Sequence, residues 1–123
     1  MIFKILIADD DYINRRLLIS LLKKELYNVE IIEAIDGKTA LDVCKEADDI
    51  QLILVDIEMP VMDGSEFIKQ YRNKYNNKIP ILAISSNDLR ATEVLYMGAN
   101  SFLVKPITSE KLLNAIVNVQ ENN

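Results

Sequence analysis

The pattern of apolar and polar positions along the chain predicts five strands that alternate with five helices. Short runs rich in Ile, Val and Leu mark the strands. These runs are Phe3–Ala8, Val29–Ala34, Gln51–Val55, Pro80–Ile84 and Ser101–Val104. Several of them are apolar almost without interruption, as expected when helices cover both faces of a parallel sheet.

Between the runs, apolar residues recur every four positions, which is typical of one face of a helix. The clear repeats are Ile13, Leu17 and Leu21, then Phe67, Tyr71 and Tyr75, then Leu112 and Ile116. The segments Lys38–Ala47 and Asp88–Met97 carry a weaker repeat. Strict alternation of strand and helix predicts an open doubly wound sheet of the α/β class, because five units are too few for an eight-stranded barrel.

Length and composition indicate one soluble globular domain. The chain has 123 residues with no linker, repeat or low-complexity segment, so we expect a single domain over residues 1–123. No apolar run approaches the ~20 residues that span a bilayer, and the N-terminus lacks the layout of a signal peptide. We therefore expect a cytoplasmic protein without a membrane segment.

The charged and sulfur-containing residues narrow the chemistry. The chain has no histidine, which excludes Ser-His triads, histidine acid–base catalysis and His-ligated zinc. The formal net charge is −5 and no basic run occurs, so we expect no nucleic acid to bind to this chain alone. Cys44, the single cysteine, shares a predicted helix face with Leu41 and Ala47, so we expect a buried, inert thiol.

Polar residues gather where the predicted strands end, at the edge where such sheets bind ligands. They are Asp9-Asp10-Asp11, Asp36-Gly37, Asp56 with Glu58, Ser85-Ser86-Asn87 and Lys105-Pro106. Singly, each has an ordinary explanation: Asp11 or Asn87 as a helix cap, Ser85 as a turn residue, Lys105 as a solvated charge. Their joint arrival at one edge from separate strands favours a functional site.

Asp56 is the most unusual of these residues, because it ends the apolar part of LILVDIEMPVMDG and burial of an unpaired carboxylate is costly. Carboxylates ~4 Å apart repel by a few kcal/mol per pair at an effective dielectric of ~20, and a divalent cation removes this repulsion. Oxygen ligands select a hard ion, Mg²⁺ or Mn²⁺. A metal, the Lys105 ammonium and the Ser85 hydroxyl around a carboxylate nucleophile predict a phosphoryl-transfer site.

Four segments, ILIADDDYINRRLL, LILVDIEMPVMDG, ILAISS and FLVKPI, together resemble the receiver domain of bacterial two-component response regulators, from Phe3 to about Gln120. The resemblance implies a flavodoxin-like five-stranded parallel sheet with strand order 2-1-3-4-5. It implies that a histidine kinase or histidine phosphotransfer protein donates a phosphoryl group to Asp56. It further implies that the chain is no enzyme beyond assisting its own phosphorylation and dephosphorylation, and that phosphorylation can produce a dimer.

The resemblance also implies a metal site. Asp10 would ligate Mg²⁺ directly and Asp9 largely through water. Asp56 and the backbone carbonyl of Glu58 would complete the shell. Glu58 and Asn87 occupy variable positions that, in the family, tune the loss of the phosphoryl group.

The remaining implied roles belong to the switch. Ser85 would move its hydroxyl toward the phosphoryl group, Lys105 would pair with that group, and the Lys105-Pro106 peptide would be cis. Phe102 would be the switch aromatic, turning inward into the space that Ser85 vacates. This movement would change the face made by the fourth helix, fifth strand and fifth helix. Ser86 stands where the family prefers a small residue such as Ala.

Two other classes of protein share features with this sequence but fit it less well. A phosphate-ester hydrolase of the haloacid dehalogenase type also has a nucleophilic Asp, but it needs a Thr where Pro60 stands and a cap domain for which there is no room. A nucleotide-binding module would need a phosphate loop where Asp9-Asp10-Asp11 would repel phosphate. The segments DDDYINRRLL and DIEMPVMDG favour a receiver from a hybrid histidine kinase, whereas the initial Met also suits a stand-alone regulator.

Overall fold

In the computed structural model, which describes residues 2–75 and 78–121, five strands alternate with five α-helices. The strands are β1 (Phe3–Ala8), β2 (Val29–Ala34), β3 (Leu52–Asp56), β4 (Ile81–Ser85) and β5 (Ser101–Val104). The helices are α1 (Tyr12–Glu25), α2 (Gly37–Glu46), α3 (Gly64–Lys74), α4 (Ala91–Met97) and α5 (Ser109–Glu121), with a 3₁₀ turn, η1 (Asp88–Arg90), before α4.

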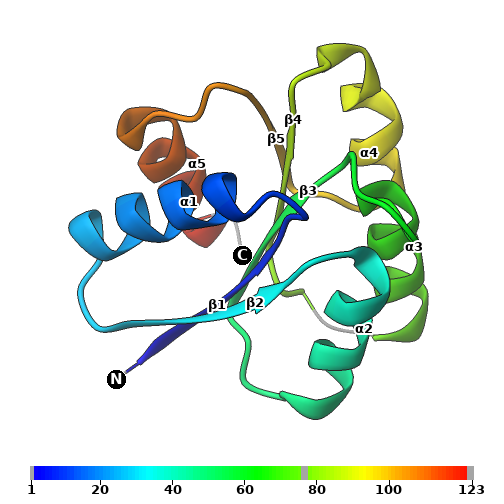
Figure 1. Cartoon of the computed structure of the whole chain (residues 1–123), viewed down its shortest axis with the longest axis horizontal. Helices are drawn as coiled ribbons and strands as arrows, with labels where there is room; N and C mark the ends of the chain where they lie inside the picture. Colours follow the sequence, from blue (N-terminus) through cyan, green and yellow to red (C-terminus); the bar gives the residue numbers. More distant parts are fainter. Residues whose placement is uncertain (1, 76–77, 122–123) are drawn as a thin grey trace.

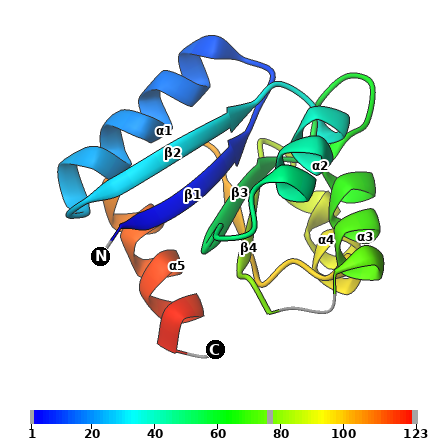
Figure 2. The same ribbon diagram turned by 90° about the horizontal axis from the view of Figure 1, so that it is seen from below.

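The strands form one parallel sheet in the order β2-β1-β3-β4-β5. Helices α1 and α5 cover one face of the sheet, and α2, α3 and α4 cover the other (Figures 1 and 2). This arrangement confirms the predicted doubly wound α/β fold and its strand order. The carboxyl ends of β1, β3 and β4 meet at one edge, because Ala8 pairs with Val55 and Asp56 pairs with Ile84.

The core has two layers, one on each face of the sheet. Alternate residues of β1 point to opposite faces, so Ile5 and Ile7 pack with α1 and α5 while Leu6 and Ala8 pack with α2, α3 and α4. Every residue of β3 and of β4 is buried. Burial on both faces explains why these two strands read as uninterrupted apolar runs.

Strands β3 and β4 each begin and end one residue later than the sequence predicted. Pro80 lacks an N–H group and lies before β4, although its carbonyl accepts from the Ile53 N–H at 3.0 Å. Asp56 and Ser85 are therefore the last residues of their strands and not the first residues of loops. Consequently the sheet fixes the backbone of both residues.

The fourth helix differs from the predicted Asp88–Met97 in its first turn. Residues Asp88–Arg90 form the 3₁₀ turn η1, and α4 itself has only 7 residues. Asn87 explains this start, since its side chain accepts from the Leu89 N–H at 3.0 Å. The weak helical period over this segment is consistent with a short helix.

Three of the other helices begin at an aspartate that caps them. Asp11, Asp36 and Asp63 accept hydrogen bonds from backbone N–H groups in the first turns of α1, α2 and α3. The ordinary explanation offered for Asp11 is thus confirmed. None of the helices in the described residues has the length and apolar character to cross a bilayer.

Cys44 lies in α2, as predicted, with its thiol buried in the core beneath this helix. Burial raises the pKa of the thiol to about 12. The expected burial is confirmed. Because the thiolate is the reactive form, the raised pKa supports an inert thiol, which stays a prediction.

Candidate functional site

Three carboxylates meet at the carboxyl edge of the sheet. Asp9 and Asp10 follow β1, Asp56 ends β3, and one carboxylate oxygen of each lies within 4.8 Å of the others. Asp9 is 1% and Asp56 is 4% exposed, whereas Asp10 is open to solvent. The predicted acidic cluster therefore forms, with Asp11 turned away to cap α1.

Burial and mutual repulsion disfavour the charged form of the carboxyl groups in this cluster. Burial, followed by the nearby charge of Asp56, raises the pKa of Asp9 to about 6, although the Asp11 N–H donates to its Oδ1 at 2.9 Å. Burial likewise raises the pKa of Asp56 against the opposing effect of Lys105. Clustered acids with raised pKa values are a feature of sites that bind cations or react.

Lys105 provides the positive charge at this edge. Its Nζ donates to Asp56 Oδ2 at 2.8 Å, and the backbone N–H of Glu58 donates to Asp56 Oδ1 at 3.1 Å. Burial lowers the pKa of Lys105, but the hydrogen bond to Asp56 and the charges of the surrounding acids outweigh it, so the pKa is raised overall. The Lys105-Pro106 peptide is cis, as the family resemblance implied.

Ser85 lies at the same edge, but its hydroxyl points to a partner that the sequence did not predict. The side chain is fully buried, and Oγ donates to Glu58 Oε1 at 2.8 Å with Oε2 at 3.0 Å. Oγ also accepts from the Asn87 N–H at 3.0 Å. The expected movement of Ser85 toward a phosphoryl group stays a prediction.

Arg90 is the residue of this region that sequence reasoning missed. It extends from η1 toward the start of α3, where Nη2 donates to Ser65 Oγ at 3.1 Å and lies 3.6 Å from Asp63, the residue that caps this helix. Nη1 lies 3.6 Å from Glu58 Oε2, and Nη2 pairs with Glu93 at 2.8 Å. Most of these partners come from another segment of the chain, so no local pattern marked Arg90.

Phe102, the proposed switch aromatic, lies in β5, where it pairs with Ala83 of β4. Its ring is partly buried and packs against the core layer beneath α2, α3 and α4. Its role as a switch stays a prediction. The backbone carbonyl of Glu58 likewise stays a predicted metal ligand.

The loop after Asp56 approaches the backbone of Asp56 closely. A Cβ atom on Gly64 would lie 2.5 Å from the Asp56 carbonyl oxygen and 2.8 Å from Ile57 Cα, which is too close for any side chain. The Gly64 N–H donates to the Ile57 carbonyl at 2.8 Å. Glycine is therefore required where α3 begins, and the first residue of this helix packs directly against the backbone of Asp56.

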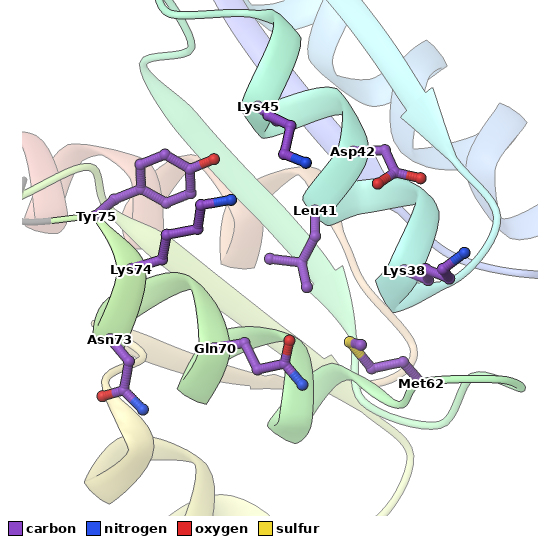
Figure 3. Close-up of a pocket in the computed structure, with 9 residues that line it drawn as sticks. All are labelled: Lys38, Leu41, Asp42, Lys45, Met62, Gln70, Asn73, Lys74 and Tyr75. Carbon is purple, nitrogen blue, oxygen red and sulfur yellow. The ribbon is translucent and has the colours of Figure 1, made fainter.

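A groove of about 500 Å³ lies elsewhere, between α2 and α3 (Figure 3). Its rim carries Lys38, Lys45 and Lys74, and Leu41 and Met62 supply apolar contacts. None of the acidic-edge residues Asp9, Asp10 and Asp56 lines it. The groove is thus separate from the carboxylate cluster.

The donor set of the acidic edge suits a hard divalent cation. It offers carboxylate oxygens alone, without thiolate or imidazole, and this selects Mg²⁺-like ions. Asp10 is open to water, which suits Mg²⁺ because this ion keeps several waters. A bound cation would also compensate the charges of Asp9 and Asp56, whose pKa values are raised mainly by burial.

Comparison with known proteins places this geometry in a family. Residues 5–117 match the response regulator receiver domain. Response regulator GtcR of Aneurinibacillus migulanus is 35% identical over 94% of this chain and 46% of its own length. Transcriptional regulatory protein CpxR of Escherichia coli K12 is 35% identical, covering 92% and 47%. Hybrid signal transduction histidine kinase I of Dictyostelium discoideum is 32% identical, covering 95% and 7%.

Solved structures agree with these matches. A CheX–CheY–BeF3–Mg²⁺ complex from Borrelia burgdorferi contains a chain with a TM-score of 0.88 and 28% identity, covering 96% of this chain and 89% of that one. Chemotaxis protein CheY4 of Vibrio cholerae gives a TM-score of 0.84 at 34% identity, covering 97% and 99%. This chain spans less than half the length of the three curated relatives named above. By sequence and by fold, the chain belongs to the response regulator receiver domain family of two-component signalling.

Proposed function

We propose that Asp56 accepts a phosphoryl group from a phosphohistidine of a histidine kinase or histidine phosphotransfer protein. The phosphorus–nitrogen bond breaks, a phosphorus–oxygen bond forms at the Asp56 carboxylate, and the histidine leaves with its electron pair. The observation that carries this proposal is the placement of Asp56, which is buried at the end of β3 with Lys105 at 2.8 Å and two further acids beside it. The match to receiver domains supports it, and it leaves the haloacid dehalogenase alternative without support.

The same cluster would hold the metal. Asp9, Asp10 and Asp56 would bind Mg²⁺, with the Glu58 carbonyl as a further ligand, and Mn²⁺ has the same ligand preference. Bound there, the ion would neutralise charge that develops on the phosphoryl oxygens. Lys105 would contribute a second positive charge through its contact with Asp56 Oδ2 at 2.8 Å, and Ser85 would contribute a hydroxyl donor.

The proposal extends to partners and context. With no histidine in the chain, the phosphodonor is another molecule or another part of a longer protein. The domain covers residues 1–123, of which residues 1, 76–77 and 122–123 lie outside the described structure. In this proposal it is a cytoplasmic switch that assists its own phosphorylation and dephosphorylation, and its signal leaves through the face of α4, β5 and α5, where phosphorylation can produce a dimer. Hybrid kinases and separate regulators both occur among the relatives.

Labelling with acetyl phosphate tests the assignment of Asp56. Wild-type protein with Mg²⁺ should gain one phosphoryl group per chain, measured as a mass increase on intact protein. Asp56→Asn should gain none, because an amide oxygen is a poor nucleophile. Asp49→Asn, which alters an exposed aspartate, is the matched control and should label like wild type. Persistent labelling of Asp56→Asn at the same stoichiometry would refute the assignment.

A metal titration tests the acidic cluster. Calorimetric titration of wild-type protein with Mg²⁺ should show one weak site. Asp10→Ala should weaken this site about tenfold or more, because it removes one of three carboxylate ligands. Asp48→Ala, which removes an exposed acid outside the cluster, should leave the titration unchanged. An unchanged titration in Asp10→Ala would place the metal elsewhere.

A further inference from the structure

The hydroxyl proton of Ser85 is already committed in this structure. Oγ is fully buried and lies 2.8 and 3.0 Å from the two carboxylate oxygens of Glu58. The Asn87 N–H donates to the same Oγ and fixes its position. A serine hydroxyl has a single proton to donate, so donation to Glu58 withholds that proton from any other acceptor.

Glu58 connects this hydroxyl to the acceptor aspartate. Its backbone N–H donates to Asp56 Oδ1 at 3.1 Å while its side chain holds Ser85. Among the hydrogen bonds of residues 2–75 and 78–121, none joins Ser85 directly to Asp56. Glu58 therefore contacts both groups that a phosphoryl group would bring together.

The Glu58 carboxylate is held in place even though its side chain is 45% exposed. Arg90 Nη1 lies 3.6 Å from Oε2, on the oxygen that is the more distant from Ser85. Arg90 is itself anchored by Glu93 at 2.8 Å and by Ser65 at 3.1 Å. This anchoring lowers the entropic cost of keeping Glu58 beside Ser85.

We propose that Glu58 is a positioning residue whose carboxylate holds the Ser85 hydroxyl in a resting position, and that a phosphoryl group on Asp56 must compete with Glu58 for the Ser85 proton. The inference rests on the proposed function and adds a regulatory element to it. The resting hydrogen bond has a charged acceptor, and such bonds are stronger than neutral ones. Glu58 thus weakens the binding of a phosphoryl group by stabilising the state in which the Ser85 hydroxyl donates to Glu58.

Charge repulsion offers a second route to the same weakening. The Glu58 carboxylate is close enough to raise the pKa of Asp56 through its charge. An anionic group on Asp56 would therefore be repelled by Glu58 whether or not Ser85 is present. The two explanations differ in one respect: only the competition for the proton depends on the Ser85 hydroxyl.

A double-mutant cycle distinguishes competition for the Ser85 proton from charge repulsion by Glu58. The probe is beryllofluoride, an anionic mimic of the phosphoryl group, titrated calorimetrically at saturating Mg²⁺. Glu58→Ala should raise the affinity about tenfold when Ser85 is present, in line with loss of a hydrogen bond to a charged group. In a Ser85→Ala background the same substitution should change the affinity less than about twofold. An equal gain in both backgrounds, or no gain in either, would overturn the inference.

Two further variants sharpen the result. Glu58→Gln removes the charge but keeps an acceptor for Ser85, so it should gain clearly less than Glu58→Ala, whereas repulsion would make both gains equal. Asp48→Ala removes an exposed acid outside the site with the same change of net charge and should stay within about twofold of wild type. Equal gains in Glu58→Gln and Glu58→Ala, or in Asp48→Ala and Glu58→Ala, would contradict the competition.

The same titration distinguishes failure of the inference from failure of the proposed function. Wild-type protein that binds no beryllofluoride with Mg²⁺ would contradict both. Wild-type binding that is lost in Asp56→Asn but unaffected by Glu58→Ala would leave the proposed function standing and remove the role of Glu58. Circular dichroism melts of each variant check that the protein keeps its fold when the exposed side chain of Glu58 is replaced.

Discussion

Two lysine–aspartate pairs of equal length lie at opposite ends of the sheet. Lys105 meets Asp56 at the carboxyl edge and Lys4 meets Asp49 at the other end, each at 2.8 Å. Their settings differ, since the side chain of Asp56 is 4% exposed and that of Asp49 is 62% exposed. The hydrogen bond to Lys4 lowers the pKa of Asp49, whereas burial raises the pKa of Asp56 in spite of Lys105.

The comparison shows that equal contact distances do not imply equal roles. The Lys4–Asp49 pair is solvated, and such pairs contribute little to stability or chemistry. The Lys105–Asp56 pair belongs to a buried group of acids whose charges are incompletely compensated. A folded chain keeps such a group at an energetic cost, and the cost is expected where a cation and a phosphoryl group are to bind.

The largest expected difference between the two pairs is in phosphorylation. Lys105→Met should lower the rate of labelling by acetyl phosphate about a hundredfold, because a preorganised cation at the reacting oxygen is lost. Lys4→Met should label at the wild-type rate. Both rates are measured by intact mass over time at fixed Mg²⁺. Equal rates in the two variants would remove the functional distinction between the pairs.

A smaller difference is expected in how substitutions next to Asp56 and next to Asp49 change the free energy of unfolding. Gly64→Ala should lower the free energy of unfolding by about 1–3 kcal/mol, since its Cβ would overlap the Asp56 carbonyl oxygen. It should also slow labelling by displacing Asp56. Asp48→Ala, in the open loop beside Asp49, should change neither quantity. Urea denaturation provides the measurement, and wild-type stability in Gly64→Ala would mean that the loop moves aside freely.

The smallest expected effect is on the pH dependence of stability without metal. The folded-state pKa of Asp9, about 6, lies above its ordinary value of 3.8, so the fold favours the protonated carboxyl group. The stability of the folded protein is therefore unaffected by Asp9 below pH 3.8 and falls as the pH rises from there through about 6, where the buried carboxylate becomes charged. Asp9→Asn should therefore gain stability relative to wild type by about 1–2 kcal/mol between about pH 4 and pH 7, after allowance for solvent screening. Asp49→Asn should show no such gain. The comparison requires urea denaturation in EDTA, and parallel pH curves for wild type and Asp9→Asn would contradict it.

The position of the acidic edge was predictable from the sequence because parallel strands end together. Asp9, Asp56, Ser85 and Lys105 each follow or end an apolar run, and the alternation with helices brings these ends to one side. The one-residue shift of β3 and β4 was less accessible, since strand pairing decides it and apolar character does not. It moved Asp56 and Ser85 from loops into the sheet.

The orientation of side chains within the site was not predictable in the same way. Ser85 has several acceptors within reach, and the loop geometry selects Glu58. Arg90 contacts Ser65 and Asp63 across a sequence separation of 25 residues or more, which no periodicity records. Sequence patterns identify which groups share an edge, whereas hydrogen-bond choice depends on ångström-scale placement.

The place of β3 within the sheet has a consequence for motion. This strand is central, hydrogen-bonded to β1 on one side and to β4 on the other, and all five of its residues are buried. We therefore expect the backbone amides of β3 to exchange with deuterium only through near-global opening, and those of the short α4 to exchange through local fraying. In the proposed function, the phosphoryl acceptor then lies on a segment that is expected to open last, and the loops and helix around it can rearrange while β3 stays folded.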